Sequence, residues 1–505
     1  MVIPAHTRWA ALTTSVILLA SGLVLWPYIN NGLWADDAYN SQIWGMVHRF
    51  DTTLWAFTAR ITHNWVTQAG RLLVAWPWIY SFFYVVHDML AVRLVNLAFV
   101  ALHIGCFVYL MRLLRVSWTA CALFALILPM LFQMRGANDP VAAFATFSQV
   151  LGILLTGGLI FIAKWYASGK TLHLVAATLI VGISLLGYEI NLVFFPLAVI
   201  AILAAPHPHK LRNLLVLMAP CIAFLAATAY VKSHTTTPYP GTAIGQLSAV
   251  PLTYAVQAVA ALPGSYYGLF AIKGLPPEAL WATTRVTPLA WAAALAVLVA
   301  MLAIGRGARR HERGRPDAWA APALVATVLA LGPPALIALS ARYQAELDWG
   351  LAHLPVYYQQ FGVALMLALV MRAGVRPTWG ACALGTLVAA YAAFNLTVNL
   401  RTAEPIDAWY KEPLMSFSQA LDDGLLAEVA EGDVLEPDKG MPPYINGNLI
   451  YQRLHKRVSV SDEVAIAGLF EAPPRPGARH FRLWRDPARQ HAWRVDALSA
   501  PAPLP

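Results

Sequence analysis

The chain has 505 residues, of which 59% are hydrophobic and only 12% are charged, and its formal net charge is +9. This composition lies outside the range of soluble globular domains and predicts an integral membrane protein. The basic residues are spread over short segments instead of one patch, so the excess charge favours membrane lipids and argues against a nucleic-acid partner. The four cysteines lie in apolar runs without metal-ligand spacing, which predicts neither a disulfide framework nor a zinc site.

Apolar segments recur along most of the chain and predict an all-α polytopic protein with about eleven transmembrane helices. The predicted spans are residues 9–29, 91–111, 117–133, 144–163, 171–187, 190–205, 211–230, 287–305, 319–340, 354–371 and 378–398. Residues 72–86 are short and contain Pro77, so we expect them to lie along the membrane interface. No clear small-residue cleavage site follows the first span, and we expect it to be retained.

The connections between the predicted spans differ in charge from one side to the other. Lys and Arg gather in alternate connections, at residues 112–115, 164–170, 210–212, 306–315 and 372–376. The positive-inside rule therefore predicts a cytoplasmic N-terminus, a first outside loop at residues 30–90 and an outside C-terminal region. Counting residues 72–86 as a crossing would place every basic connection outside.

Two adjacent carboxylates, Asp36 and Asp37, follow the first predicted span at the membrane–water boundary. Such a pair costs desolvation and mutual repulsion, which indicates a function. Because adjacent side chains seldom point the same way, we expect one aspartate to act as a general base and the other to hold the acceptor or a metal. A divalent cation, Mg²⁺ or Mn²⁺, held by both is a further possibility. The alternative, which we consider the weaker one, is a solvated pair at a helix end. The residues alone do not show which aspartate is the base.

Two features follow in the same loop. Residues 52–63 predict an amphipathic interfacial helix. Arg71 comes next, within Gly70-Arg71, and its guanidinium is suited to bind a phosphate through two parallel hydrogen bonds. Anchoring to lipid headgroups is an equally good interpretation of this arginine.

Further candidates lie on the predicted outer face. Asp139 and Glu189 are acids at the outer ends of spans, although Asp139 precedes Pro140 and equally suits a cap or turn. Arg342 is a second phosphate candidate. Aromatic and polar residues of the fourth outside loop and the next span predict a sugar pocket, with an interfacial aromatic belt as the alternative. They are Tyr343, Glu346, Asp348, His353, Tyr357, Tyr358 and Gln359.

The composition changes near residue 400. Residues 401–505 are polar and rich in proline, and they predict a small soluble α/β domain that follows a transmembrane module of residues 1–400. Residues 444–448 predict a turn before a strand, with acceptor binding as an alternative. We expect residues 472–505 to be loosely ordered.

The order of parts in the first outside loop resembles the GT-C superfamily of membrane glycosyltransferases. The resemblance is carried by Asp36-Asp37 after the first span, the predicted interfacial helix, Gly70-Arg71, and the run His-Asp-Met-Leu-Ala-Val-Arg-Leu at residues 87–94. This superfamily includes O-antigen glucosyltransferases, lipid A aminoarabinose transferases and protein O-mannosyltransferases. The arrangement is most similar to the O-antigen glucosyltransferase branch.

The resemblance implies a hexosyltransferase of the bacterial inner membrane, with its C-terminal region in the periplasm. It implies a polyprenyl-phosphate sugar donor, a glycan or glycolipid acceptor on the outer face, and a catalytic loop aspartate, and we expect inversion at the sugar. Two other functions stay open. A transporter or flippase for lipid-linked glycans would predict repeated halves and broken central spans. A non-catalytic assembly protein of surface polysaccharide synthesis would retain the fold without the chemistry.

Overall fold

The structure is a computed structural model that describes residues 5–235, 239–278, 285–311, 319–439, 441–461, 477–486 and 492–498. Residues 312–315 of the predicted basic connection at 306–315 lie outside the described residues. The chain divides into two compact units. The first is Met1–Asn30, His63–Ala75 and Arg93–Ala403, and the second is Asn31–Thr62, Trp76–Val92 and Glu404–Pro505. The predicted boundary at residue 400 stays a prediction.

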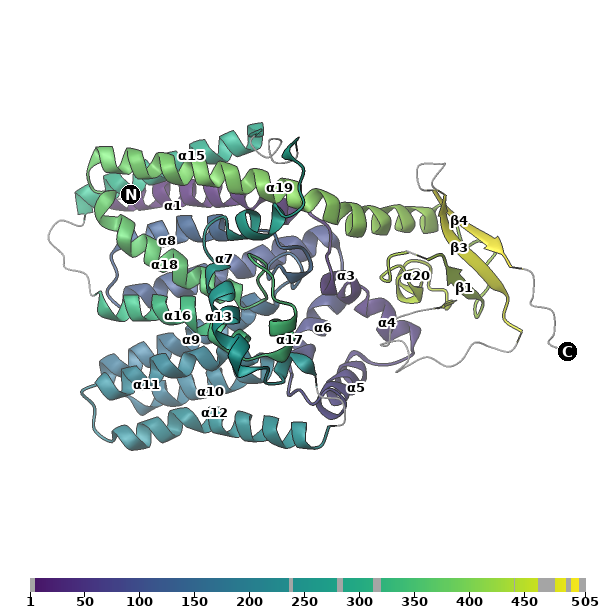
Figure 1. Ribbon diagram of the computed structural model, residues 1–505, viewed down its shortest axis with the longest axis horizontal. Helices are drawn as coiled ribbons and strands as arrows, with labels where there is room; N and C mark the ends of the chain where they lie inside the picture. The colour runs from purple at the N-terminus through teal and green to yellow at the C-terminus, as the bar shows by residue number, and fades with distance from the viewer. Residues whose placement is uncertain are drawn as a thin grey trace. The chain divides into compact units, whose positions relative to one another are not determined.

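The first unit is a bundle of apolar helices, which Figure 1 shows side by side with roughly parallel axes. Its longer helices are α1 (Ala5–Val24), α7 (Met89–Leu113), α8 (Trp118–Leu131), α9 (Phe147–Ser168), α10 (Thr171–Gly187), α11 (Phe194–Ala204), α12 (Lys210–Ser233), α15 (Pro288–His311), α16 (Ala320–Ala338), α18 (Val356–Gly374) and α19 (Thr378–Asp422). Between them lie α2 (Trp26–Asn30), the 3₁₀ turn η2 (Glu189–Val193), α13 (Val250–Val259) and α17 (Ala341–Ala345).

A helix forms at each of the apolar segments that the sequence marks as spans. Within the described ranges, six helices are long and apolar enough to cross a membrane, namely α7, α9, α12, α15, α16 and α19. This result supports a helical protein embedded in a membrane. The number of eleven crossings stays a prediction, because helices such as α8, α10 and α11 are shorter.

Close approach of backbones and stacking of aromatic rings hold the bundle together. Gly362 of α18 faces α16 so closely that a Cβ atom there would lie 2.4 Å from the backbone nitrogen of Ala330. Small residues permit this approach, and close van der Waals packing is what joins helices in an apolar environment. Phe107 of α7, Phe124 of α8 and Phe361 of α18 form one aromatic cluster, with centroid separations of 4.9 to 5.8 Å.

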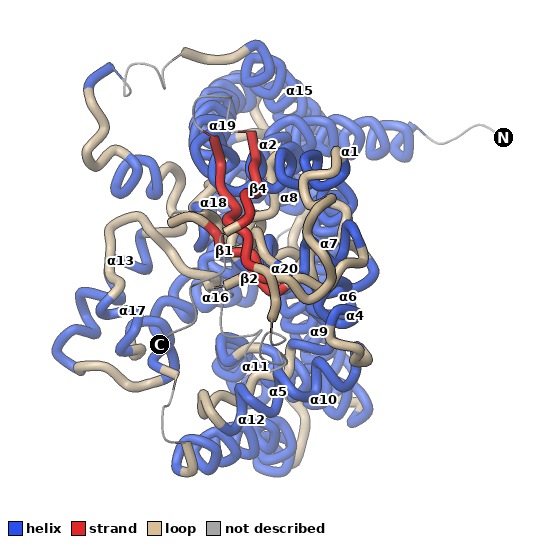
Figure 2. The backbone as a smooth tube through the Cα atoms, turned by 90° about the vertical axis from the view of Figure 1, so that its right-hand side faces the viewer, coloured by secondary structure: helices blue, strands red, loops and turns tan. Residues whose placement is uncertain are grey.

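The second unit combines short helices of the loop between α1 and α7 with the C-terminal region. The loop contributes α3 (Asp36–Asn40), α4 (Ile43–Arg49), the first part of α5 (Leu54–Thr67) and α6 (Trp76–Val85). The C-terminal region contributes β1 (Val434–Pro437), α20 (Gly447–Leu454), β2 (Ser459–Val460), β3 (His480–Asp486) and β4 (Ala492–Ala497). Figure 2 shows the strands in red. Their order is β2-β1-β3-β4, with β1 parallel to β2 and β3, and β3 antiparallel to β4.

Buried polar contacts join the C-terminal region to the loop between α1 and α7. The Arg49 guanidinium of α4 donates to Asn448 Oδ1 at 3.1 Å, and the Gln42 amide donates to the Tyr444 carbonyl at 2.7 Å. A Cβ atom at residue 447 would lie 2.4 Å from Arg49 Cζ, so only glycine leaves room for this guanidinium. Helices α4 and α20 therefore pack as one layer, although about four hundred residues separate them in sequence.

Helix α19 is longer than the sequence indicated. The predicted span stops at residue 398, yet the helix continues to Asp422 and includes Pro405 and Pro413. Its C-terminal part buries Phe417 and Leu421, which are 0% and 1% exposed. Burial of this apolar face offsets the loss of helix stability that the prolines cause. The polar composition after residue 400 therefore does not mark the end of the helix.

One further expectation for the C-terminal region is wrong. The turn at residues 444–448 leads into helix α20 instead of a strand, because the Asn446 side chain accepts hydrogen bonds from the amides of Asn448 and Leu449 and so caps the helix. The expectation that residues 472–505 are loosely ordered stays a prediction, since residues 472–476, 487–491 and 499–505 lie outside the described residues. The described part of this segment contains strands β3 and β4. Their six paired positions place Leu483 and Val495 opposite each other, and backbone pairing outweighs the polar, proline-rich composition.

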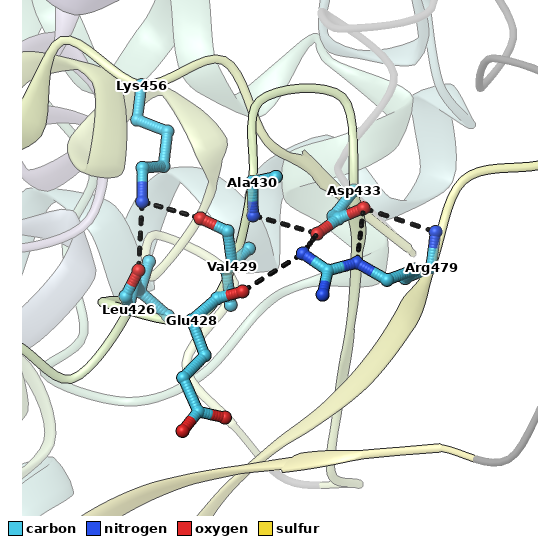
Figure 3. Close-up of polar contacts among 7 residues, drawn as sticks. All are labelled: Leu426, Glu428, Val429, Ala430, Asp433, Lys456 and Arg479. Carbon is cyan, nitrogen blue, oxygen red and sulfur yellow. Dashed lines mark hydrogen bonds and ion pairs between the residues drawn. The ribbon is translucent and has the colours of Figure 1, made fainter.

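A buried carboxylate joins the strands of this region (Figure 3). Asp433, 8% exposed, accepts hydrogen bonds from the Ala430 amide at 2.8 Å and from Arg479 Nη2 at 2.7 Å. Arg479 Nη2 also donates to the Glu428 carbonyl, and Lys456 donates to the carbonyls of residues 426 and 429. Burial opposes ionisation of Asp433, but these donors outweigh it and lower its pKa.

Replacement of this carboxylate will destabilise the second unit in a pH-dependent way. Because the pKa of Asp433 is lowered on folding, its contribution is complete above the ordinary value of 3.8 and is lost as the pH falls through the folded-state value. We expect Asp433→Asn to cost about 1–3 kcal/mol at pH 7, with the difference from wild type shrinking below pH 4. Thermal unfolding at several pH values measures this. The exposed Asp423→Asn is the matched control.

Candidate functional site

An open cavity of about 200 Å³ lies in the first unit. Its wall is largely apolar, and its polar end carries two cationic side chains and one carboxylate. The charged residues of the lining are Arg71, Lys232 and Glu189, and the polar end also includes Tyr188, Tyr239 and Tyr343. The apolar residues are Ile190, Leu192, Phe224, Leu225, Ile244, Leu336, Ile337 and Leu339. The cavity therefore offers adjoining surfaces for an anion and for an apolar chain.

The loop after α5 places Arg71 at the polar end. Gly70 adopts φ +63°, in the left-handed region that favours glycine, and reverses the chain direction there. The Arg71 amide then donates to the Trp65 carbonyl at 3.1 Å, and the Val74 amide donates to the Leu186 carbonyl of α10 at 2.6 Å. The loop is thus fixed on both sides of the arginine.

Arg71 forms a two-pronged ion pair with Glu189, the first residue of η2. Nε and Nη2 donate to Oε1 and Oε2, each at 2.9 Å, and the side chains are 12% and 26% exposed. The guanidinium also lies over the rings of Tyr239 and Tyr188, at 5.0 and 5.7 Å from their centroids. Burial would raise the pKa of Glu189, but Arg71 outweighs this effect and lowers it. Both groups are therefore charged at neutral pH.

Arg342 brings a second guanidinium to the same tyrosine. Its Nη1 donates to the Tyr239 hydroxyl at 2.5 Å, and its Nε donates to Glu346 Oε1 at 2.8 Å. The ring of Tyr343 packs against His353 with centroids 4.2 Å apart. The predicted residues Arg71, Glu189, Arg342, Tyr343, Glu346 and His353 are therefore brought together around Tyr239.

Burial keeps the other two titratable side chains of this group neutral. It raises the pKa of Tyr343 to about 12 and lowers the pKa of His353 to about 4. At neutral pH both side chains therefore act as hydrogen-bonding groups without charge, and the cations that line the cavity are Arg71 and Lys232.

A short strand-like contact fixes the outer wall of the cavity. Ile244 and Ser340 form an isolated antiparallel bridge, and the Ser340 hydroxyl donates to the Gly241 carbonyl at 2.8 Å. The Gln344 side chain both donates to and accepts from the backbone of Gln246, at 3.0 and 2.8 Å. These contacts bind the loop after α12 to the end of α16, although about a hundred residues separate them.

Other predicted site residues lie elsewhere in the first unit. Asp139, 1% exposed, accepts from the amides of Val141 and Ala142 at 2.8 and 2.7 Å, as a turn cap does. Asp348 pairs with Lys273. The remaining three, Tyr357, Tyr358 and Gln359, are buried in α18 and do not line the cavity.

Asp36 and Asp37 belong to the second unit, at the start of α3. Asp36 is exposed, whereas Asp37 is 1% exposed. The expectation that the two carboxylates have different roles stays a prediction. Within the described ranges no group of three or more His, Cys, Asp or Glu side chains is placed to hold a metal ion. A divalent cation at this pair stays a prediction.

Sequence reasoning missed Lys232 and Tyr239, two of the residues that define the cavity. Lys232 lies in the last turn of an apolar helix, where a lysine ordinarily anchors to lipid headgroups, and it donates here to the Thr242 carbonyl. In the sequence, Tyr239 cannot be told from the other tyrosines expected at the membrane interface. Its position between two guanidinium groups depends on contacts distant in sequence, including its amide bond to the Ala69 carbonyl at 2.7 Å.

No protein-family model matches the chain, and a search of curated proteins gave no match.

Replacement of either Arg71 or Glu189 will leave the other as a largely buried charge without a counter-ion. We expect Arg71→Met to lower stability by about 2–3 kcal/mol, because Glu189 then lacks its counter-ion. The double variant Arg71→Met, Glu189→Met should recover most of that loss. Thermal unfolding of the two single variants and the double variant measures the coupling free energy between Arg71 and Glu189. If the stability losses of the single variants simply add in the double variant, the predicted coupling is absent.

Proposed function

We propose that the protein is a membrane glycosyltransferase of the GT-C type that moves a hexose from a polyprenyl-phosphate donor to a glycan or glycolipid acceptor. The observation that carries this proposal is the cavity of the first unit, which joins cationic groups to an apolar wall. A polyprenyl phosphate has the same two parts, an anionic headgroup and a long apolar chain. The order of parts in the first outside loop supports the same class.

The cationic end of the cavity suits the phosphate of the donor. The hydrogen bonds from Arg71 to Glu189 use two of the five N–H donors of a guanidinium. Lys232 adds a second cation to the lining. As the bond between the sugar and the phosphate breaks, negative charge grows on the phosphate oxygens, and fixed cations lower the energy of that transition state. Arg71 and Lys232 are our candidates for this role.

The proposed reaction needs a base for the acceptor. The acceptor hydroxyl oxygen forms a bond to the anomeric carbon, and the bond from that carbon to the phosphate oxygen breaks with its electrons leaving on the polyprenyl phosphate. The hydroxyl proton goes to a carboxylate, and attack opposite the leaving group inverts the anomeric centre. We assign the base to Asp36, because it is exposed while Asp37 is buried.

Loss of the base should abolish transfer without loss of the fold. Purified protein in lipid nanodiscs is incubated with a radiolabelled polyprenyl-phosphate hexose and a lipid-linked glycan acceptor. We expect Asp36→Asn to lower the rate at least about a hundredfold, and Arg71→Lys to weaken donor binding because lysine lacks the planar fork. The exposed Asp423→Asn should transfer at the wild-type rate.

Two results would contradict this proposal in different ways. Full transfer by both Asp36→Asn and Asp37→Asn would reject the assigned base. A wild-type protein that transfers no sugar from any polyprenyl-phosphate donor would reject the transferase itself.

We also infer an orientation in the bacterial inner membrane, with the N-terminus in the cytoplasm and the second unit in the periplasm. The basic connections support it through the positive-inside rule. Alkaline phosphatase fused after Gly424, beyond the end of α19, should be active, and green fluorescent protein fused at the same residue should be dark. The reverse pattern would invert the topology.

A further inference from the structure

A second cluster of polar aromatic side chains lies in the second unit. Three tyrosines from separate segments meet there: Tyr39 of α3, Tyr410 of α19 and Tyr444 before α20. The rings of Tyr410 and Tyr444 stack with centroids 5.3 Å apart, and Tyr39 meets Tyr444 edge-on at 6.4 Å. Tyr39 lies three residues after Asp36 in α3, and burial together with the Asp36 charge raises the pKa of Tyr39 and of Tyr410.

The three rings differ in exposure. Tyr444 is only 1% exposed, and its hydroxyl donates to the Trp409 carbonyl. Tyr39 and Tyr410 are half-buried, and Asp36 is exposed. One buried ring therefore supports two partly accessible rings that lie near an exposed carboxylate.

Asp407 of α19 holds the backbone that leads to Asp36. Its Oδ1 accepts hydrogen bonds from the Gly32 amide at 2.7 Å and from the Trp34 indole at 2.9 Å. Ala35 then adopts φ +46°, which is unfavourable for a residue other than glycine and persists because its neighbours are fixed. The position of the carboxylate relative to the tyrosines is thus set before any ligand binds.

We propose that Asp36, Tyr39 and Tyr410 bind a pyranose ring of the acceptor, with Tyr444 as their support. The C–H face of a pyranose packs on aromatic rings, and a carboxylate accepts hydrogen bonds from its hydroxyls. Assignment to the acceptor rests on the proposed function. The donor is the poorer candidate, because the Asp36 carboxylate would repel its phosphate.

Saturation-transfer NMR on the full chain tests the proposal without requiring turnover. The protein is placed in lipid nanodiscs, since detergents with sugar headgroups would compete for the site. Methyl α-D-glucopyranoside and methyl α-D-mannopyranoside are the ring probes, and mannitol is the control because it has hydroxyls but no ring face. We expect transfer to the ring protons of at least one probe and little to mannitol.

The variants separate ring stacking from general packing. Tyr39→Leu and Tyr410→Leu keep apolar volume but remove the flat face, so binding should weaken about five- to tenfold. Tyr451→Leu should bind like wild type, because the Tyr451 ring contacts His455 and Arg457 instead. Thermal unfolding checks that each variant folds. If a leucine variant does not fold, the exposed Asp36→Asn supplies the decisive measurement of hexose binding.

Each outcome decides for or against the site. Unchanged hexose signals in the folded variants, or equal transfer to mannitol, would overturn it. Hexose binding that these substitutions abolish, in a protein without transfer activity, would keep the sugar site and reject the transferase. Normal transfer by Tyr39→Leu and Tyr410→Leu, with an unchanged KM for the acceptor, would reject the site and keep the transferase.

Discussion

The ion pair between Arg71 and Glu189 is the interaction on which the candidate donor site depends. A charged side chain inside a largely apolar bundle is tolerated only beside a group of opposite charge. Arg71 and Glu189 are counter-ions to each other. Their pairing fixes the loop after α5 against the end of α10 and brings Tyr239 and Tyr188 onto the guanidinium. The same pair keeps a cation beside an apolar wall, with N–H donors that the carboxylate does not use.

In the second unit, contacts with residues distant in sequence stabilise short helices that would not be stable alone. Helices α3 and α4 are five and seven residues long, too short to be stable alone. They are held by buried hydrogen bonds from Arg49 and Gln42 to the C-terminal region and by Asp407 on the preceding loop. The C-terminal region therefore holds in place the loop that carries Asp36 and Asp37.

Several features of this architecture were predictable because they depend on local composition. The apolar segments became helices, and the sequence marked Glu189 as an acid at the end of a predicted span and Arg71 as a candidate to bind a phosphate. The errors fall where tertiary contacts override composition. Prolines in α19 are outweighed by burial of Phe417, and the turn at Asn446 leads to a helix because its side chain caps one. The sequence also gave no means to separate Tyr343, near the cavity, from Tyr357, buried in α18.

By itself, the sequence determined a helical membrane protein and the chemical types from which a site could be built, because hydropathy and charge are properties of short segments. Only the tertiary structure decided which of those groups meet. Arg71 and Glu189 are 118 residues apart, and Tyr39 and Tyr444 come from opposite ends of the chain. Their association depends on loops held by backbone contacts distant in sequence, and no local pattern encodes such contacts. The exposure of Asp36 and the burial of Asp37 likewise depend on the tertiary structure.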